Sequence, residues 1–161
     1  MKNFLLLATV AAFAFGGDLE DGLKAYANSD FELATKKFNA ACDKQDKLGC
    51  EKLGAMYQAG KNLTEDKNHA LQAYLKACEL GSGKGCSGAA GLYTGENDDK
   101  AQELFRKACE LGEGYACGVV GSYLIDKQQF KEANAFFVKS CKLGDKLGCE
   151  FAKDLVRSKR L

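Results

Sequence analysis

Four pairs of cysteines recur along this chain with one internal spacing, and this repeat constrains the fold more than any other feature. Seven residues separate the two members of each pair, and successive pairs are offset by 36, 31 and 32 residues. An alanine stands eight residues before the first cysteine of every pair, and an aromatic residue stands four residues before it. The pairs are Cys42/Cys50, Cys78/Cys86, Cys109/Cys117 and Cys141/Cys149. Self-similarity at this period is typical of a helical solenoid.

The spacing within one copy predicts a hairpin of two helices. The alanine, the aromatic residue and the first cysteine lie on one face of an α-helix, which is the first helix of the unit. A glycine three residues after that cysteine is placed to end the helix in a left-handed conformation in three copies, at Gly81, Gly112 and Gly144. The second helix starts near the second cysteine. Its small residues Gly54, Gly91 and Gly121 are expected to let neighbouring helices approach closely.

The hairpins divide the chain into regular units. We expect a repeat domain over residues 17–161, with repeats at about 30–58, 66–94, 98–124 and 129–158. An additional helix is predicted at Asp18–Asn28, before the first repeat. In the longer segment before the second repeat, Thr64 is placed to cap the next helix, and Glu65 and Asp66 favour its positive end.

The first 16 residues have the layout of a secretory signal peptide. Lys2 supplies the positive charge, an apolar stretch runs from Phe4 to Phe15, and cleavage is expected after Ala14 or Gly16. The alternative is an uncleaved anchor, but the stretch is short for a bilayer span, which needs about 20 residues. We therefore expect a secreted or periplasmic protein, without stable membrane insertion after cleavage, in an oxidising compartment.

Eight cysteines permit 105 pairings, and the repeat symmetry selects one of them. Each pair joins the last turn of one helix to the first turn of the next, where antiparallel helices lie close enough for a bridge. The predicted disulfides are therefore 42–50, 78–86, 109–117 and 141–149. Metal binding and redox chemistry are the alternatives, but zinc sites and oxidoreductases favour shorter spacings that are absent here. We expect no metal and no cofactor.

Two strings carry a resemblance to a known family: A70-L-Q-A-Y-L-K-A-C-E-L-G81 with Cys86, and A101-Q-E-L-F-R-K-A-C-E-L-G112 with Cys117. With these strings, residues 30–152 resemble the Helicobacter cysteine-rich proteins, which are built from Sel-one-like repeats related to the tetratricopeptide repeat. The resemblance implies an all-α fold, an α/α solenoid of four disulfide-stapled hairpins, and export. It also implies penicillin binding or weak β-lactamase activity, as members of the family are commonly described.

The residues themselves offer no catalytic set for that activity, so the catalytic residues stay unknown. Serine β-lactamases need a serine followed by lysine at the third position, and none of the six serines has it. A zinc enzyme needs several histidines, and His69 is the single one. We interpret His69 as a solvated residue at a helix start.

A peptide groove is the binding hypothesis. Solenoids expose an extended face, usually lined by the first helix of each unit. On that helix, two positions flank the core stripe, and their residues are Thr35, Asn39, Leu71, Leu75, Gln102, Arg106, Asn134 and Val138. The alternative is that these side chains pack against neighbouring helices.

The sequence thus predicts a monomeric repeat scaffold that binds a protein or peptide. A β-lactam or a cell-wall-derived small molecule is a further ligand, implied by the resemblance. The net charge of +1 gives no electrostatic basis for nucleic-acid binding. The alternatives are a weak β-lactamase and a purely structural envelope protein.

Overall fold

A computed structural model describes residues 17–60 and 66–158, and over these ranges it contains nine α-helices and no strand. The predicted signal peptide, together with Thr64 and Glu65, lies outside the described residues. The helices are α1 (Gly17–Ala27), α2 (Phe31–Asp43), α3 (Lys47–Gln58), α4 (Lys67–Glu79), α5 (Gly83–Tyr93), α6 (Asp98–Glu110), α7 (Gly114–Asp126), α8 (Phe130–Lys142) and α9 (Lys146–Arg157).

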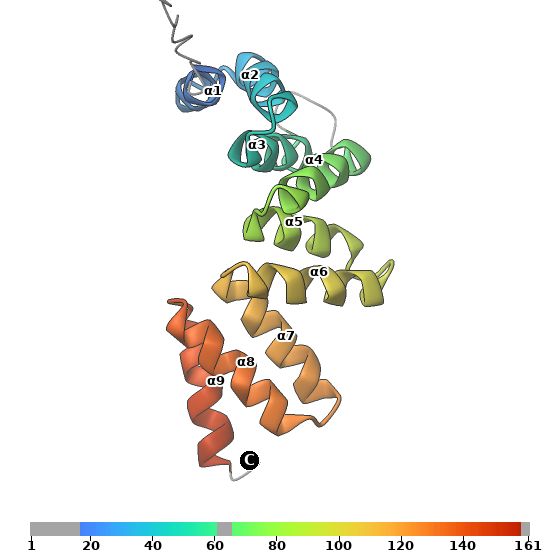
Figure 1. The fold of residues 1–161 in the computed structure, drawn as a ribbon, viewed down its shortest axis with the longest axis vertical. Helices are drawn as coiled ribbons and strands as arrows, with labels where there is room; N and C mark the ends of the chain where they lie inside the picture. Colours follow the sequence, from blue (N-terminus) through green and yellow to red (C-terminus); the bar gives the residue numbers. More distant parts are fainter. Residues whose placement is uncertain (1–16, 61–65, 159–161) are drawn as a thin grey trace, which may run out of the picture.

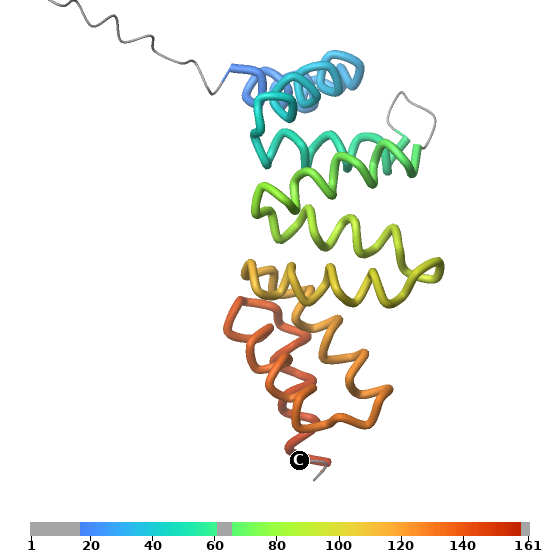
Figure 2. The backbone as a smooth tube through the Cα atoms, turned by 45° about the vertical axis from the view of Figure 1, so that its right-hand side comes forward, coloured from blue at the N-terminus to red at the C-terminus, as the bar shows by residue number. Residues whose placement is uncertain are grey.

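The helices pair into four hairpins that stack along the long axis of the molecule, with α1 before the first hairpin. Figure 1 shows α1 at one end of the stack and α9 at the other. Figure 2 shows the same order, with α4, α5 and α6 running across the long axis and the last three helices inclined toward it. The predicted α/α solenoid is confirmed.

All four predicted disulfides are formed, each between the end of a first helix and the start of a second one. They join Cys42 to Cys50, Cys78 to Cys86, Cys109 to Cys117 and Cys141 to Cys149. Their Cα–Cα distances are 4.4–4.7 Å, at the short end of the range for a disulfide. None of the cysteines in the described ranges is free. The bridges therefore tie the two helices of each hairpin together at the turn.

Local signals start and end these helices. Gly81, Gly112 and Gly144 have φ angles of 85°, 91° and 92°, and Gln45 takes the same left-handed conformation in the first hairpin with φ 64°. The start of α4 corrects the prediction for Thr64, because Asp66 is the capping residue. Its carboxylate accepts a hydrogen bond from the backbone N–H of His69 at 3.0 Å.

At junctions between hairpins, an aromatic ring from a first helix packs between the second helices of the two adjoining hairpins. A Cβ built on Gly54 of α3 or on Gly88 of α5 would lie 2.7 Å from the ring of Tyr74. Gly121 meets the ring of Phe137 in the same way, at 2.8 Å. Small residues thus let the rings enter the core.

The prediction of close approach at Gly91 is wrong. Gly91 is exposed, and a Cβ there would meet no atom within 4 Å. Ala90, one residue earlier, holds the position four residues after the second cysteine that Gly54 and Gly121 hold in their hairpins, and it is fully buried. The small residue needed at this junction is therefore an alanine.

Charged side chains fasten α1 to the first hairpin. The carboxylate of Asp18 accepts hydrogen bonds from Lys44 and from Lys37, the latter at 3.0 Å, and Lys37 also reaches Asp21 at 3.0 Å. The Lys44 and Lys37 ammonium groups lower the pKa of Asp18 below its ordinary value of 3.8. Because the pKa of Asp18 is lower in the folded state, this stabilisation is present above pH 3.8 and is lost as the pH falls through the folded-state pKa.

Replacing Asp18 should therefore remove an acid-sensitive component of α1 docking. We expect Asp18→Asn to speed amide exchange in α1 at neutral pH, and the difference from the parent protein to shrink below pH 3.8 and to vanish below the folded-state pKa of Asp18. Hydrogen exchange followed by mass spectrometry measures this. Glu20→Gln is the control, because Glu20 pairs with Lys24 inside α1 and leaves the junction intact. Parallel pH profiles for the parent and Asp18→Asn would contradict the assignment.

Candidate binding surfaces

In the first three hairpins the predicted cysteines are buried in the core and are not accessible to a ligand. These six cysteines are Cys42, Cys50, Cys78, Cys86, Cys109 and Cys117. Four of them are 0% exposed, and the other two are at most 3% exposed. Only the fourth pair, Cys141 and Cys149, is half-buried. The role of the six buried cysteines is therefore confined to bridging and packing.

Cys50 illustrates this role. The second helix α3 begins at Lys47, so Cys50 lies in its first turn, as the sequence predicts. Cys50 is 0% exposed and packs in one cluster with Phe38 and Leu53. Its Sγ atom lies 3.6 Å from the carbonyl oxygen of Cys42. Because this sulfur is bonded to the Cys42 sulfur, it carries no proton, and the contact is a packing contact rather than a hydrogen bond.

The eight residues of the predicted groove lie on the first helices of the four hairpins, but they do not share one environment. Leu71 and Leu75 of α4 are half-buried and pack against the hydrophobic core. Thr35 donates a hydrogen bond to the carbonyl oxygen of Phe31 at 2.8 Å, and Asn39 donates to Asp43 at 3.2 Å. Thr35 and Asn39 are thus engaged within their own helix, and the two leucines of α4 serve packing.

The other half of the predicted row lies on α6 and α8, beside a hollow of about 270 Å³. Arg106 is the member of the row that lines it. The Cζ atom of Arg106 lies 5.3 Å from the centre of the Phe136 ring, and its Nη1 atom lies 3.6 Å from a carboxylate oxygen of Glu132. Such an arrangement orients a guanidinium group over an aromatic face. The remaining lining residues are Glu110, Ala135 and Lys139.

Two amide side chains at equivalent positions of α6 and α8 have no hydrogen-bond partner for their oxygen atoms. These are Gln102 Oε1 and Asn134 Oδ1, each buried and each one residue after the repeated alanine. A buried acceptor without a partner is costly. Val138, the last member of the row, is exposed.

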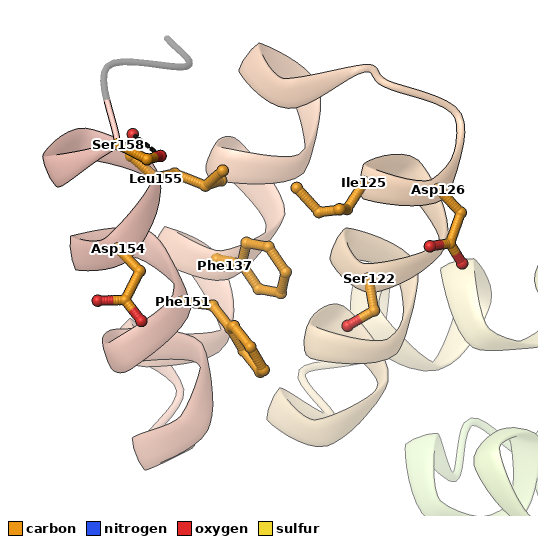
Figure 3. Close-up of a pocket in the computed structure, with 8 residues that line it drawn as sticks. All are labelled: Ser122, Ile125, Asp126, Phe137, Phe151, Asp154, Leu155 and Ser158. Atoms are coloured by element: carbon orange, nitrogen blue, oxygen red, sulfur yellow. Dashed lines mark hydrogen bonds between the residues drawn. The ribbon is translucent and has the colours of Figure 1, made fainter.

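A larger cleft of about 440 Å³ lies between α7, α8 and α9 (Figure 3). The rings of Phe137 and Phe151 stack with their centres 5.0 Å apart, and Ile125 and Leu155 extend toward each other above them. Two serines and two aspartates complete the lining: Ser122, Asp126, Asp154 and Ser158. This cleft was not predicted from the sequence, because the predicted row contains residues of the first helices alone. The available signal was Phe151 and Leu155, four residues apart on one face of α9.

The described residues contain no candidate metal centre. Within 17–60 and 66–158, no group of three or more His, Cys, Asp and Glu side chains could hold a metal ion. His69 is exposed as expected, hydrogen-bonds to Asp66 and stacks on Tyr57. The His69 backbone N–H, followed by the His69 ring, lowers the pKa of Asp66. Ser82 caps α5 and donates to Glu51 at 2.8 Å, so its hydroxyl has a structural role.

Membrane insertion has no candidate in the helices just described. Across the two described ranges, none of the helices combines the length and the apolar character needed to cross a bilayer.

Comparison with known families gives a match to the Sel1 repeat. It covers residues 48–82 and 87–113, which include all of α4 and α6 and most of α3 and α5. Among solved structures, a Sel1 repeat protein from Oxalobacter formigenes superposes with a TM-score of 0.73 at 21% identity, over 81% of this chain and 56% of that one. This likeness establishes the fold as a Sel1-type solenoid.

Two curated proteins are similar over part of the chain. HcpC of Helicobacter pylori, named as a candidate beta-lactamase, is 31% identical over 71 residues, which are 38% of this chain and 24% of HcpC. Cytochrome c oxidase assembly factor 7A of Xenopus laevis is 35% identical over 74 residues, which are 45% of this chain and 32% of that protein. The chain therefore spans about a quarter to a third of the curated relatives that it matches.

Proposed function

We propose that this chain, which carries Sel1 repeats, is an interaction scaffold that binds a peptide segment of a partner protein along the first helices of its hairpins. The hollow between α6 and α8 carries this proposal. There the Arg106 guanidinium, the Phe136 ring and the Lys139 ammonium face one space of about 270 Å³. Such a space fits one or two side chains and is too small for a folded domain.

The chemistry of this hollow suits a peptide backbone with an acidic or polar side chain. Arg106 and Lys139 can donate to carbonyl and carboxylate oxygens, while the Phe136 ring offers an apolar surface. The amide side chains of Gln102 and Asn134 repeat along the same row, on the first helices of two successive hairpins. Polar groups repeated in this way suit an extended chain better than a compact ligand.

The proposed location is outside the cytoplasm, secreted or periplasmic. Four disulfides support it, because they persist in oxidising compartments and are rare in the cytosol. The predicted signal peptide at residues 1–16 agrees with this location. N-terminal sequencing of the exported protein would test it.

Binding and packing can be separated within the predicted row. We expect Arg106→Ala to weaken a peptide selected from a random displayed library about tenfold, with a change of under about 0.5 kcal/mol in the free energy of unfolding. Leu75→Ala should instead cost about 1–2 kcal/mol of stability, because Leu75 packs against the core. Calorimetric titration and urea unfolding give the two readouts.

The exposed Lys107, next to Arg106 on the same helix, supplies the control. Lys107→Ala removes an equal charge outside the hollow and should leave affinity and stability unchanged. Equal loss of affinity in the Arg106 and Lys107 variants would reduce the interaction to general charge attraction. A large loss of stability in Arg106→Ala would make the row a packing surface.

Penicillin binding or weak β-lactam hydrolysis is the second candidate. Its support is the similarity to HcpC, over 38% of this chain. Incubation of the oxidised protein with a chromogenic β-lactam, beside a mock purification, tests it. Ring opening that copurifies with the protein and disappears on reduction would favour the enzyme, whereas stoichiometric binding without turnover would favour a scaffold that holds the drug.

A further inference from the structure

The cleft between α7 and α9 has a counterpart at the other end of the array. A hollow of about 140 Å³ lies between α1 and α3, with Phe38 at the position of Phe137. The residues of α3 that line it correspond position by position to those of α9 in the larger cleft, when the two helices are aligned on Cys50 and Cys149. Lys52 stands where the larger cleft has Phe151, and Ala55 stands where it has Asp154. The smaller hollow is thus an internal reference with which the larger cleft can be compared.

Against this reference the α7–α9 cleft differs in both size and charge. It is about 440 Å³ rather than about 140 Å³, and it contains two carboxylates and no cationic side chain among its lining residues. The smaller hollow contains Lys52 and no carboxylate. Gly22 of α1 lies against the Phe38 ring as Gly121 of α7 lies against the Phe137 ring, and with these two glycines aligned Asp126 corresponds to Ala27. The smaller hollow therefore has no counterpart of either carboxylate, so the repeated architecture does not require them.

The helix ends strengthen the negative potential. Asp126 is the last residue of α7, and Asp154 lies in the last turn of α9. A helix C-terminus carries partial negative charge, so an acidic side chain there is unfavourable and a cation is favourable. Arg157 is the one basic residue of the described ranges paired with either carboxylate, 3.6 Å from Asp154, and both members of that pair are exposed. The end of the cleft is thus suited to a positive group.

An apolar strip continues from the cleft toward the start of the same helices. A second hollow, of about 180 Å³, shares Ser122 and Phe151 with the cleft and reaches Tyr115 and Leu147. The side chains of Tyr115, Leu147 and Phe151 are 60%, 58% and 45% exposed. Exposed large apolar groups along one continuous trough are typical of an interaction site. The trough follows helices roughly 18 Å long, which suits a polypeptide segment better than a compact molecule.

A further hairpin of the same kind would not fill this trough. The equivalent hollow between α1 and α3 is open although the next hairpins are in place beside it. Moreover, the position that receives the next aromatic ring in α3 and α7, held by Gly54 and Gly121, is the exposed Lys153 in α9. The trough therefore lies along the flank of the stack, outside the surface on which a further hairpin would pack.

We propose that the trough between α7 and α9 is a second interaction site, which binds an amphipathic segment of a partner protein with large apolar side chains followed by lysine or arginine. The apolar face lies on Tyr115, Leu147 and Phe151, and the basic end lies between Asp126 and Asp154. This site is separate from the hollow between α6 and α8.

A pair of synthetic peptides tests the proposal. The first is a 12-residue amphipathic helix with leucine and phenylalanine on one face and three lysines in its last turn, and the second has glutamates in place of the lysines. We expect the lysine peptide to bind the oxidised protein and the glutamate peptide to bind at least tenfold more weakly. Asp126→Asn with Asp154→Asn should lower the affinity for the lysine peptide about tenfold. Fluorescence anisotropy and thermal unfolding give the readouts.

Matched variants separate this site from general attraction and from the first site. Glu79→Gln with Glu103→Gln removes two exposed carboxylates of α4 and α6 and should leave binding unchanged. Arg106→Ala should also leave it unchanged, whatever its effect at the α6–α8 hollow. Phe151→Lys introduces the residue type that the smaller hollow has at this position. This substitution should abolish binding without loss of helix content. Equal binding of the two peptides, or equal loss in the two carboxylate pairs of variants, would overturn the proposal.

Discussion

Reduction of all four disulfides is expected to unfold the array under conditions in which the oxidised protein is fully helical. Each bridge closes a loop between residues eight apart, for which the chain-entropy account gives about 2.5 kcal/mol. Together they contribute about 10 kcal/mol, which is comparable with the whole stability of a typical domain, about 5–15 kcal/mol. Far-UV circular dichroism with and without a dithiol measures the loss of helix. Full helicity with eight alkylated cysteines would contradict this expectation.

The bridges should not open together. Cys141 and Cys149 are half-buried, whereas the other six cysteines, Cys50 among them, are at most 3% exposed. Because an attacking thiolate must reach a sulfur atom, the bridge between Cys141 and Cys149 is expected to open first as thiol is added. Alkylation followed by mass spectrometry gives the order. Earlier opening of the Cys78–Cys86 bridge would show that local unfolding, and not burial, controls access.

Gly85→Val is expected to cost about 3 kcal/mol or more of folding free energy. A Cβ at Gly85 would lie 2.5 Å from the Cβ of Ala77 and 2.9 Å from the backbone nitrogen of Cys78. The adjacent bridge holds these two backbones together, so the helices cannot separate to make room. The third hairpin has Ala116 at this position, so one methyl group can be accommodated there. Valine adds two further methyl groups, and urea unfolding measures their cost.

Gly91→Ala is the matched control for this substitution. Gly91 lies on the same helix, is exposed, and has no atom within 4 Å of a built Cβ. Alanine there should stabilise the protein by about 0.5–1 kcal/mol, because it restricts the unfolded chain and favours the helix. If both variants lost the same stability, helix propensity in α5 and not the close approach at Gly85 would be the cause.

The predictions that succeeded from sequence concern neighbouring residues. The Cys78/Cys86 spacing placed a bridge between helix ends, and Gly81 marked the turn between them. The prediction failed at Gly91, where an offset of one residue moves a side chain about 100° around the helix and out of the junction. Thr64 failed as a cap because an equally suitable residue, Asp66, follows it closely.

The predicted binding row was separated into two kinds of residue by the structure. Leu71 and Leu75 of α4 pack against the core, whereas Arg106 of α6 faces a hollow with Phe136. These positions are equivalent in the sequence repeat, so no periodicity distinguishes them. What distinguishes them is the neighbouring helix, whose side chains either fill the space beside the row or leave it open.

The sequence by itself determined the helical hairpins, the order of the repeats and the pairing of the cysteines. All of these depend on contacts between residues less than ten positions apart, where helix periodicity, caps and loop closure act. Only the tertiary structure decided that the α7–α9 cleft is open and acidic while its counterpart between α1 and α3 is small. The volume and charge of such a cleft depend on side chains from three helices, including Ser122, Phe137 and Phe151, which meet only once the hairpins have stacked.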